Sequence, residues 1–100
     1  MPLQLFFLPA FERSFKSLDA GQKKIVRLLL EAVEAYFASD CTLAEAQKIA
    51  PRFFYKQLRK PFYEAGIEGK LRIILRREQS QCFAILVGNH DQIKRFLAGQ

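Results

Sequence analysis

Apolar residues in the first part of the chain change from a continuous run to a helical period. Residues 3–8, LQLFFL, form a short apolar run of the kind expected for a β-strand. Phe11, Phe15 and Leu18 then recur at a spacing that places them on one helical face. The pattern therefore predicts a strand followed by a helix over residues 9–18.

A longer helical pattern follows. Asp19 and Gln22 have the spacing of a capping box, and a broad apolar stripe continues from there to about residue 37. Thr42 and Glu45 repeat the capping-box spacing. We expect the helix that begins at Thr42 to be short, because Pro51 disfavours helical backbone at the residue before it.

The period changes to that of a sheet after the middle of the chain. Residues 62–67, FYEAGI, are predicted to form a strand, and the following EG pair suits a tight hairpin turn. Residues 70–77, KLRIILRR, alternate in the way expected of the next strand. One of its faces carries Leu71, Ile73 and Leu75, and the other carries Arg72, Ile74 and Arg76.

The last part of the chain predicts one more strand and a helix. Residues 82–87, CFAILV, are apolar throughout, as expected of a strand that is buried on both faces. Asn89 and Gln92 have N-cap and N3 spacing, so the final helix should begin at His90 and run through Leu97.

These elements predict a single α+β domain over residues 1–100. We expect an antiparallel sheet made of a three-strand meander and an N-terminal edge strand. An N-terminal helical pair and a C-terminal helix should pack on this sheet. A chain of 100 residues can bury a core of its own.

Charge and composition narrow the classes of function. Sixteen Lys and Arg against ten Asp and Glu give a net charge of +6, which favours a polyanionic partner such as nucleic acid or an acidic protein segment. No apolar stretch is long enough to span a bilayer, so no membrane partner is expected. Cys41 and Cys82 form no metal or redox pattern, and we expect reduced thiols in a cytoplasmic protein without a metal or other cofactor.

An arginine, a glutamate and a histidine could lie close together at one end of the sheet and support RNA cleavage. Arg72 lies on the polar face of its strand, Glu64 on the preceding strand, and His90, the sole histidine, directly after the last strand. Antiparallel pairing should bring His90 closer to Arg72 than to Arg76. Cleavage by attack of a 2′-OH needs a base, a cation for the phosphorane charge and an acid. Glu64, Arg72 and His90 are candidates for these roles in that order.

Further basic residues are candidates for binding the RNA backbone. They are Lys56, Arg59 and Lys60 in the segment YKQLRK, together with Arg76. Each candidate also has a purely structural interpretation. Glu64 and Arg72 could form a cross-strand ion pair. The other basic residues could be solvated, and His90 could be only a helix-start residue.

Two segments resemble the RelE/ParE superfamily of type II toxin–antitoxin toxins. They are FYKQLRKPFYEAGIEGKLRIILRRE and AILVGNHDQIKRFL. Within this resemblance, Arg72 matches an Arg on the middle strand of the ribosome-dependent mRNA endoribonucleases. His90 falls where such members have an Arg or a nearby acid–base residue. Lys56, Arg59 and Lys60 correspond loosely to upstream basic residues, and Glu64 matches a common strand Glu.

The resemblance implies a toxin that cleaves mRNA on the ribosome without a metal and so inhibits translation. It also implies a cognate antitoxin as partner. Two alternatives remain open: a ParE-like inhibitor that binds DNA gyrase, and a non-toxic basic interaction module on the same fold.

Overall fold

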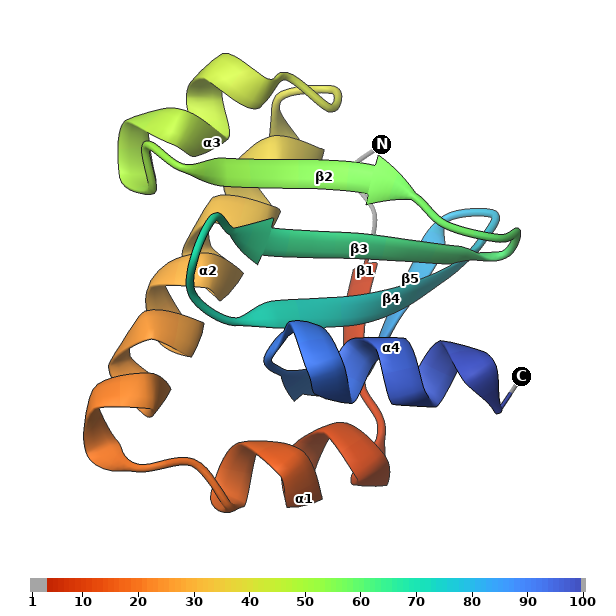
Figure 1. Cartoon of the computed structure of the whole chain (residues 1–100). Coiled ribbons are helices and arrows are strands. Elements are labelled where there is room, and N and C mark those ends of the chain that lie inside the picture. Colours follow the sequence, from red (N-terminus) through yellow and green to blue (C-terminus); the bar gives the residue numbers. More distant parts are fainter. Residues whose placement is uncertain (1–3, 100) are drawn as a thin grey trace.

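The computed structural model describes residues 4–99, which form four helices and a five-stranded sheet (Figure 1). The elements in chain order are β1 (Gln4–Phe7), α1 (Pro9–Lys16), α2 (Ala20–Ala38), α3 (Leu43–Ile49), β2 (Phe53–Gln57), β3 (Phe62–Ile67), β4 (Arg72–Glu78), β5 (Gln81–Gly88) and α4 (His90–Ala98). The predicted α+β class is therefore confirmed. The predicted first strand included Leu3, which lies outside the described residues.

The sheet has the strand order β1-β5-β4-β3-β2. Strand β1 lies at the edge, as predicted, and pairs with β5 in parallel, whereas the other pairs are antiparallel. The meander has four strands rather than the predicted three, because Phe53–Gln57 pairs with β3. The segment FFYKQ is short and only its first residue is buried, so it gives a weak apolar pattern, and its strand form depends on pairing with β3.

Local sequence signals fix most of the helix ends. Both capping boxes at Asp19 and Asn89 are formed, and each side chain accepts a hydrogen bond from the N3 backbone. The third predicted box is wrong. Thr42 is the N-cap of α3, but its hydroxyl donates to the carbonyl oxygen of Ser39 at 2.6 Å and caps nothing. Helix α3 ends at Ile49, and Ala50 before the proline is extended, as expected.

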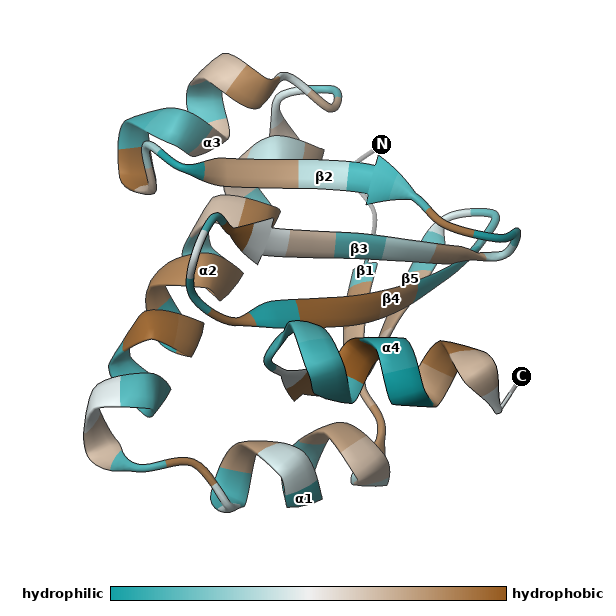
Figure 2. Ribbon diagram, viewed as in Figure 1, coloured by the Kyte–Doolittle hydropathy of each residue, from teal (hydrophilic) through white to brown (hydrophobic). Residues whose placement is uncertain are grey.

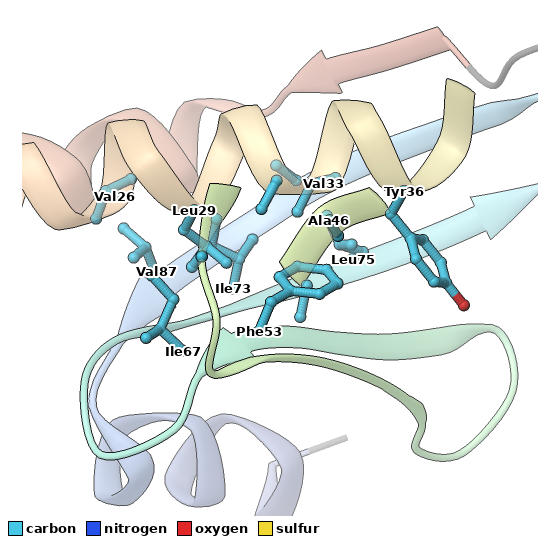
Figure 3. Close-up of a cluster of buried hydrophobic side chains, with 14 of the residues drawn as sticks. Val26, Leu29, Val33, Tyr36, Ala46, Phe53, Ile67, Ile73, Leu75 and Val87 are labelled. Carbon is cyan, nitrogen blue, oxygen red and sulfur yellow. The ribbon is translucent and has the colours of Figure 1, made fainter. Parts of the chain in front are cut away.

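The main hydrophobic core lies between one face of the sheet and helices α1, α2 and α3 (Figure 3). Helix α2 contributes Val26, Leu29 and Val33, all fully buried. They pack in the same cluster as the predicted inward face of β4, which includes Ile73 and Leu75. In Figure 2 parts of α2 and the middle of β4 have the hydrophobic colour.

Helix α4 packs on the opposite face of the sheet (Figure 1). Ile93 of α4 joins Ile74 and Ile85 in a second, smaller buried cluster. The pairing of β4 with β5 shifts register between Ile74 and Leu75, so a β-bulge lies beneath this helix. The sheet thus has a face that carries α4 as well as the candidate functional residues. None of the helices in the described part of the chain is both long and apolar enough to cross a membrane.

Candidate functional site

A buried carboxylate lies at the centre of the α4 face of the sheet. Glu64 is 3% exposed and is paired directly with Lys56 across β2 and β3. Its Oε1 lies 3.4 Å from Lys56 Nζ, and its Oε2 accepts a hydrogen bond of 3.1 Å from Arg72 Nη1. A buried carboxylate is stable only when it is paired, and here two cations from the flanking strands supply that pairing. The cross-strand ion pair that the sequence suggested is present.

Arg72 is held in position by an aromatic ring as well as by Glu64. Its guanidinium lies 5.2 Å from the ring centroid of Phe54 on β2, and Lys56 lies 5.8 Å from the same ring. The ring has room because Gly66 of β3, which lies between Phe54 of β2 and Arg72 of β4, has no side chain. A Cβ at Gly66 would lie 2.6 Å from the Phe54 ring. Arg72 Nε is buried and its N–H finds no acceptor among the described residues, so this arginine keeps one donor without a partner.

His90 is brought to the same place by the end of β5. Gly88 pairs with Arg72, and His90 begins α4 two residues later. Gln92 folds back to accept a hydrogen bond from the Asn89 backbone N–H, and a Cβ at Gly88 would lie only 2.6 Å from the oxygen of that side chain. The imidazole is 65% exposed, with Nδ1 3.7 Å from the carboxylate of Asp91. His90 therefore lies at the surface beside Arg72, as the expected strand pairing implies.

These side chains line one groove of about 240 Å³ between α4 and strands β2 to β4. The lining residues are Lys56, Leu58, Glu64, Arg72, His90, Ile93, Lys94 and Leu97. Lys94 was not predicted, although its spacing of four from His90 places both on one face of α4. Phe54 was also missed, because β2 itself was not recognised. The groove presents more positive than negative charge, and among residues 4–99 Glu64 is the only acidic residue that lines it.

Three of the predicted binding residues lie outside this groove. Arg59 and Lys60 are exposed in the connection between β2 and β3. Arg76 is on the same face of β4 as Arg72 but further along the strand, where its guanidinium lies 5.0 Å from the ring centroid of Phe83. The structure thus brings Lys56, Glu64, Arg72 and His90 together and separates them from the other basic residues that the sequence suggested.

The pKa shifts that the structure produces lie on the opposite face of the sheet. Burial raises the pKa of Tyr55 above its usual range, although the hydrogen bond that it accepts from Arg77 Nη1 at 3.5 Å opposes this effect. Burial also raises the pKa of the Cys82 thiol to about 12. No group of three or more His, Cys, Asp or Glu within residues 4–99 could hold a metal ion.

The arrangement of strands and helices is that of RelE-type toxins. A RelB–RelE antitoxin–toxin complex from Methanococcus jannaschii contains a chain with a TM-score of 0.61 and 14% identity, covering 91% of this chain and 96% of that one. A copper-bound mutant toxin from Helicobacter pylori gives a TM-score of 0.54 at 20% identity, covering 91% and 98% of the two chains. A conserved hypothetical protein from the same organism gives 0.54 at 19%, with the same coverage.

At these identities the likeness establishes the fold, and the chain has a RelE-like fold over nearly its whole length. No protein-family model and no curated protein sequence matches the chain.

Proposed function

We propose that this protein is the toxin of a type II toxin–antitoxin system, an endoribonuclease that cleaves mRNA on the ribosome in the cytoplasm and is neutralised by a cognate antitoxin. One observation carries the proposal: a basic groove brings together a carboxylate, an arginine and the sole histidine. A RelE-like fold supports it, since two solved chains of this fold are described as toxins.

The groove can supply each proton and charge that the reaction needs. Glu64 accepts the proton of the 2′-OH, and the resulting oxyanion attacks the adjacent phosphorus. The bond from phosphorus to the 5′-oxygen breaks, and protonated His90 gives its proton to that oxygen. The products are a 2′,3′-cyclic phosphate and a 5′-hydroxyl, and water exchanges the protons of both residues afterwards. Arg72 and Lys56 stabilise the negative charge that develops on the phosphate.

Glu64 acts as the base only if the substrate phosphate takes over part of its ion pairing. In the free protein its carboxylate is held by Lys56 and Arg72. A phosphate that binds Arg72 would compete with Glu64 for the guanidinium and release one carboxylate oxygen. Lys56, whose side chain is 55% exposed, gives the phosphate its first contact.

The close pairing of Glu64 also favours a second candidate function. If Lys56, Glu64 and Arg72 only stabilise the sheet, the same groove binds a partner without cleaving RNA. A gyrase inhibitor of the ParE type would act in that way.

Expression in a host without an antitoxin separates the two candidates. Under the first proposal, growth stops, and primer extension on a translated reporter message shows new 5′ ends within minutes while DNA supercoiling is unchanged. Glu64→Gln keeps the shape of the side chain and should abolish these ends. Arg95→Ala, which changes an exposed arginine of α4 outside the groove, should leave them. Intact messages with early DNA breaks would reject the nuclease and support the gyrase inhibitor.

A further inference from the structure

A row of aromatic and arginine side chains crosses the α4 face of the sheet at the end away from Arg72. Phe6 pairs with Phe83, Phe83 with Arg76, and Arg76 with Phe62, so the row spans four strands. Directly paired residues point to the same face of a sheet. We call Phe6, Phe83, Arg76 and Phe62 the aromatic row.

Three members of the row are stacked on one another. The rings of Phe6 and Phe83 are 5.5 Å apart between centroids and nearly parallel, at 26°. Arg76 lies over Phe83 at 5.0 Å. At the other end, Phe62 meets the edge of Phe96 of α4 at 6.1 Å. The helix thus covers the Phe62 end, whereas Phe6 at the open end is 40% exposed.

Phe6 exposes its ring, and Arg76 is stacked on the neighbouring ring of Phe83. Such a surface suits a nucleobase. Single-stranded nucleic acids bind to sheet faces by stacking their bases on aromatic rings and guanidinium planes, with nearby cations attracting the phosphates. The chain carries a net charge of +6, so its surface attracts such a ligand. Glu78 opposes it locally, because its carboxylate lies 3.4 Å from Arg76 Nε.

The row lies on the same face of β4 as the groove, with the buried Ile74 and helix α4 between them. Arg76 is four residues from Arg72 on the same face of β4, which corresponds to about 13 Å along the strand. A single-stranded RNA that passes beside α4 could therefore contact both Arg72 and the row.

We propose that the aromatic row is a stacking subsite for one base of single-stranded RNA, separate from the nucleotide that is bound at Arg72. This inference rests on the proposed function and extends it to a part of the sheet outside the groove.

Phe6 and Phe7 provide a matched pair for the test. They are adjacent on β1 and almost equally exposed, at 40% and 42%, but Phe7 points to the other face, where its ring centroid lies 5.2 Å from that of Phe11. The probe is a short single-stranded RNA with every 2′-OH methylated, so that it cannot be cleaved, and with 2-aminopurine at successive positions. We expect quenching at one position, and a loss of affinity of about tenfold for Phe6→Leu but not for Phe7→Leu, the order that one stacked base contributes.

An abasic scan gives the second readout. Removing one particular base should weaken the binding of RNA to the wild type but should not weaken further its binding to Phe6→Leu. Glu78→Gln removes the opposing carboxylate and should increase the affinity of the protein for the RNA. A flat abasic scan, or equal binding by both Phe variants, would overturn the proposal. So would a loss of self-association in sedimentation for Phe6→Leu alone, because the row would then contact a second copy. Message cleavage by the wild type tests the proposed function separately, so the two can fail independently.

Discussion

Arg72 has two roles, because its side chain stabilises the fold and also belongs to the proposed site. It neutralises Glu64, which is almost completely buried, and it also lines the basic groove. Removing one partner of a buried ion pair costs about 3–5 kcal/mol of folding free energy, because the other charge is left unpaired. A loss of activity in Arg72→Ala would therefore mix instability with lost chemistry. His90 is a cleaner probe, because its side chain is 65% exposed and Asn89 caps its helix independently.

We predict that His90→Ala slows single-turnover cleavage on programmed ribosomes by about 10²–10⁴, the usual contribution of one general acid. Its urea midpoint should stay close to that of the wild type. Arg72→Ala should lose more activity and also unfold at lower urea. If His90→Ala cleaves at the wild-type rate, the imidazole is only a helix-start residue and the acid must be sought among Lys56 and Lys94.

The sequence was sufficient to predict the proximity of Glu64, Arg72 and His90. Alternation along β4 and the order of antiparallel strands determine which residues share a face and an end. The pattern gave no sign that Arg59 and Lys60 lie apart from the groove, because a connection has no period from which to infer its position. The cation–π contact of Arg72 with Phe54 could not be predicted either, because Phe54 lies on β2, a strand that forms only by pairing with β3.

At the scale of elements, helices were easier to predict than the sheet. Capping boxes and apolar stripes are local, and they fixed the start of α2 and α4. Strand β2 needs β3 beside it and was missed. Thr42 shows the limit of local signals: its hydroxyl has a competing acceptor in the carbonyl of Ser39, so correct spacing did not produce a capping bond.

The contact between β2 and β3 at Gly66 gives a prediction at this scale. Gly66→Ala places a methyl group 2.6 Å from the Phe54 ring and 3.0 Å from Arg72 Cγ, so we expect it to destabilise the fold by about 1–3 kcal/mol and to reduce activity. Adding Phe54→Leu should restore part of the stability, because a smaller side chain makes room. Gly21→Ala is the control, with only an ordinary contact at 3.4 Å. Equal unfolding free energies for the two single alanine variants, measured in urea, would contradict this account.

At the scale of the whole molecule, the sheet separates two environments. One face is sealed by α1, α2 and α3, and it contains Cys82 and the half-buried Tyr55. The other carries α4, the basic groove and the aromatic row. This division explains why the pKa shifts caused by burial lie on the side opposite the proposed chemistry: those groups are removed from water by the main core.

The sealed face predicts how stability depends on alkaline pH. The native pKa of Cys82 is about 12, against an ordinary value of 9.0, so the unfolded chain loses its thiol proton first as pH rises. Above about pH 9 the folded state binds more protons than the unfolded state, and the free energy of unfolding must fall as pH increases. The raised pKa of Tyr55 acts in the same direction above its ordinary value of 10.0. Urea unfolding between pH 8 and about 11 should show this decline.

Substitutions should separate the titration from simple loss of packing. Cys82→Ala lowers stability at neutral pH by leaving a cavity, but it should flatten the alkaline decline, because the thiol that titrates is gone. Val87→Ala, another buried residue of β5, should lower stability by a similar amount at every pH and keep the wild-type slope. If Cys82→Ala and Val87→Ala show the same slope, the thiol of Cys82 does not contribute to the alkaline decline, and the remaining dependence must come from Tyr55 and other groups.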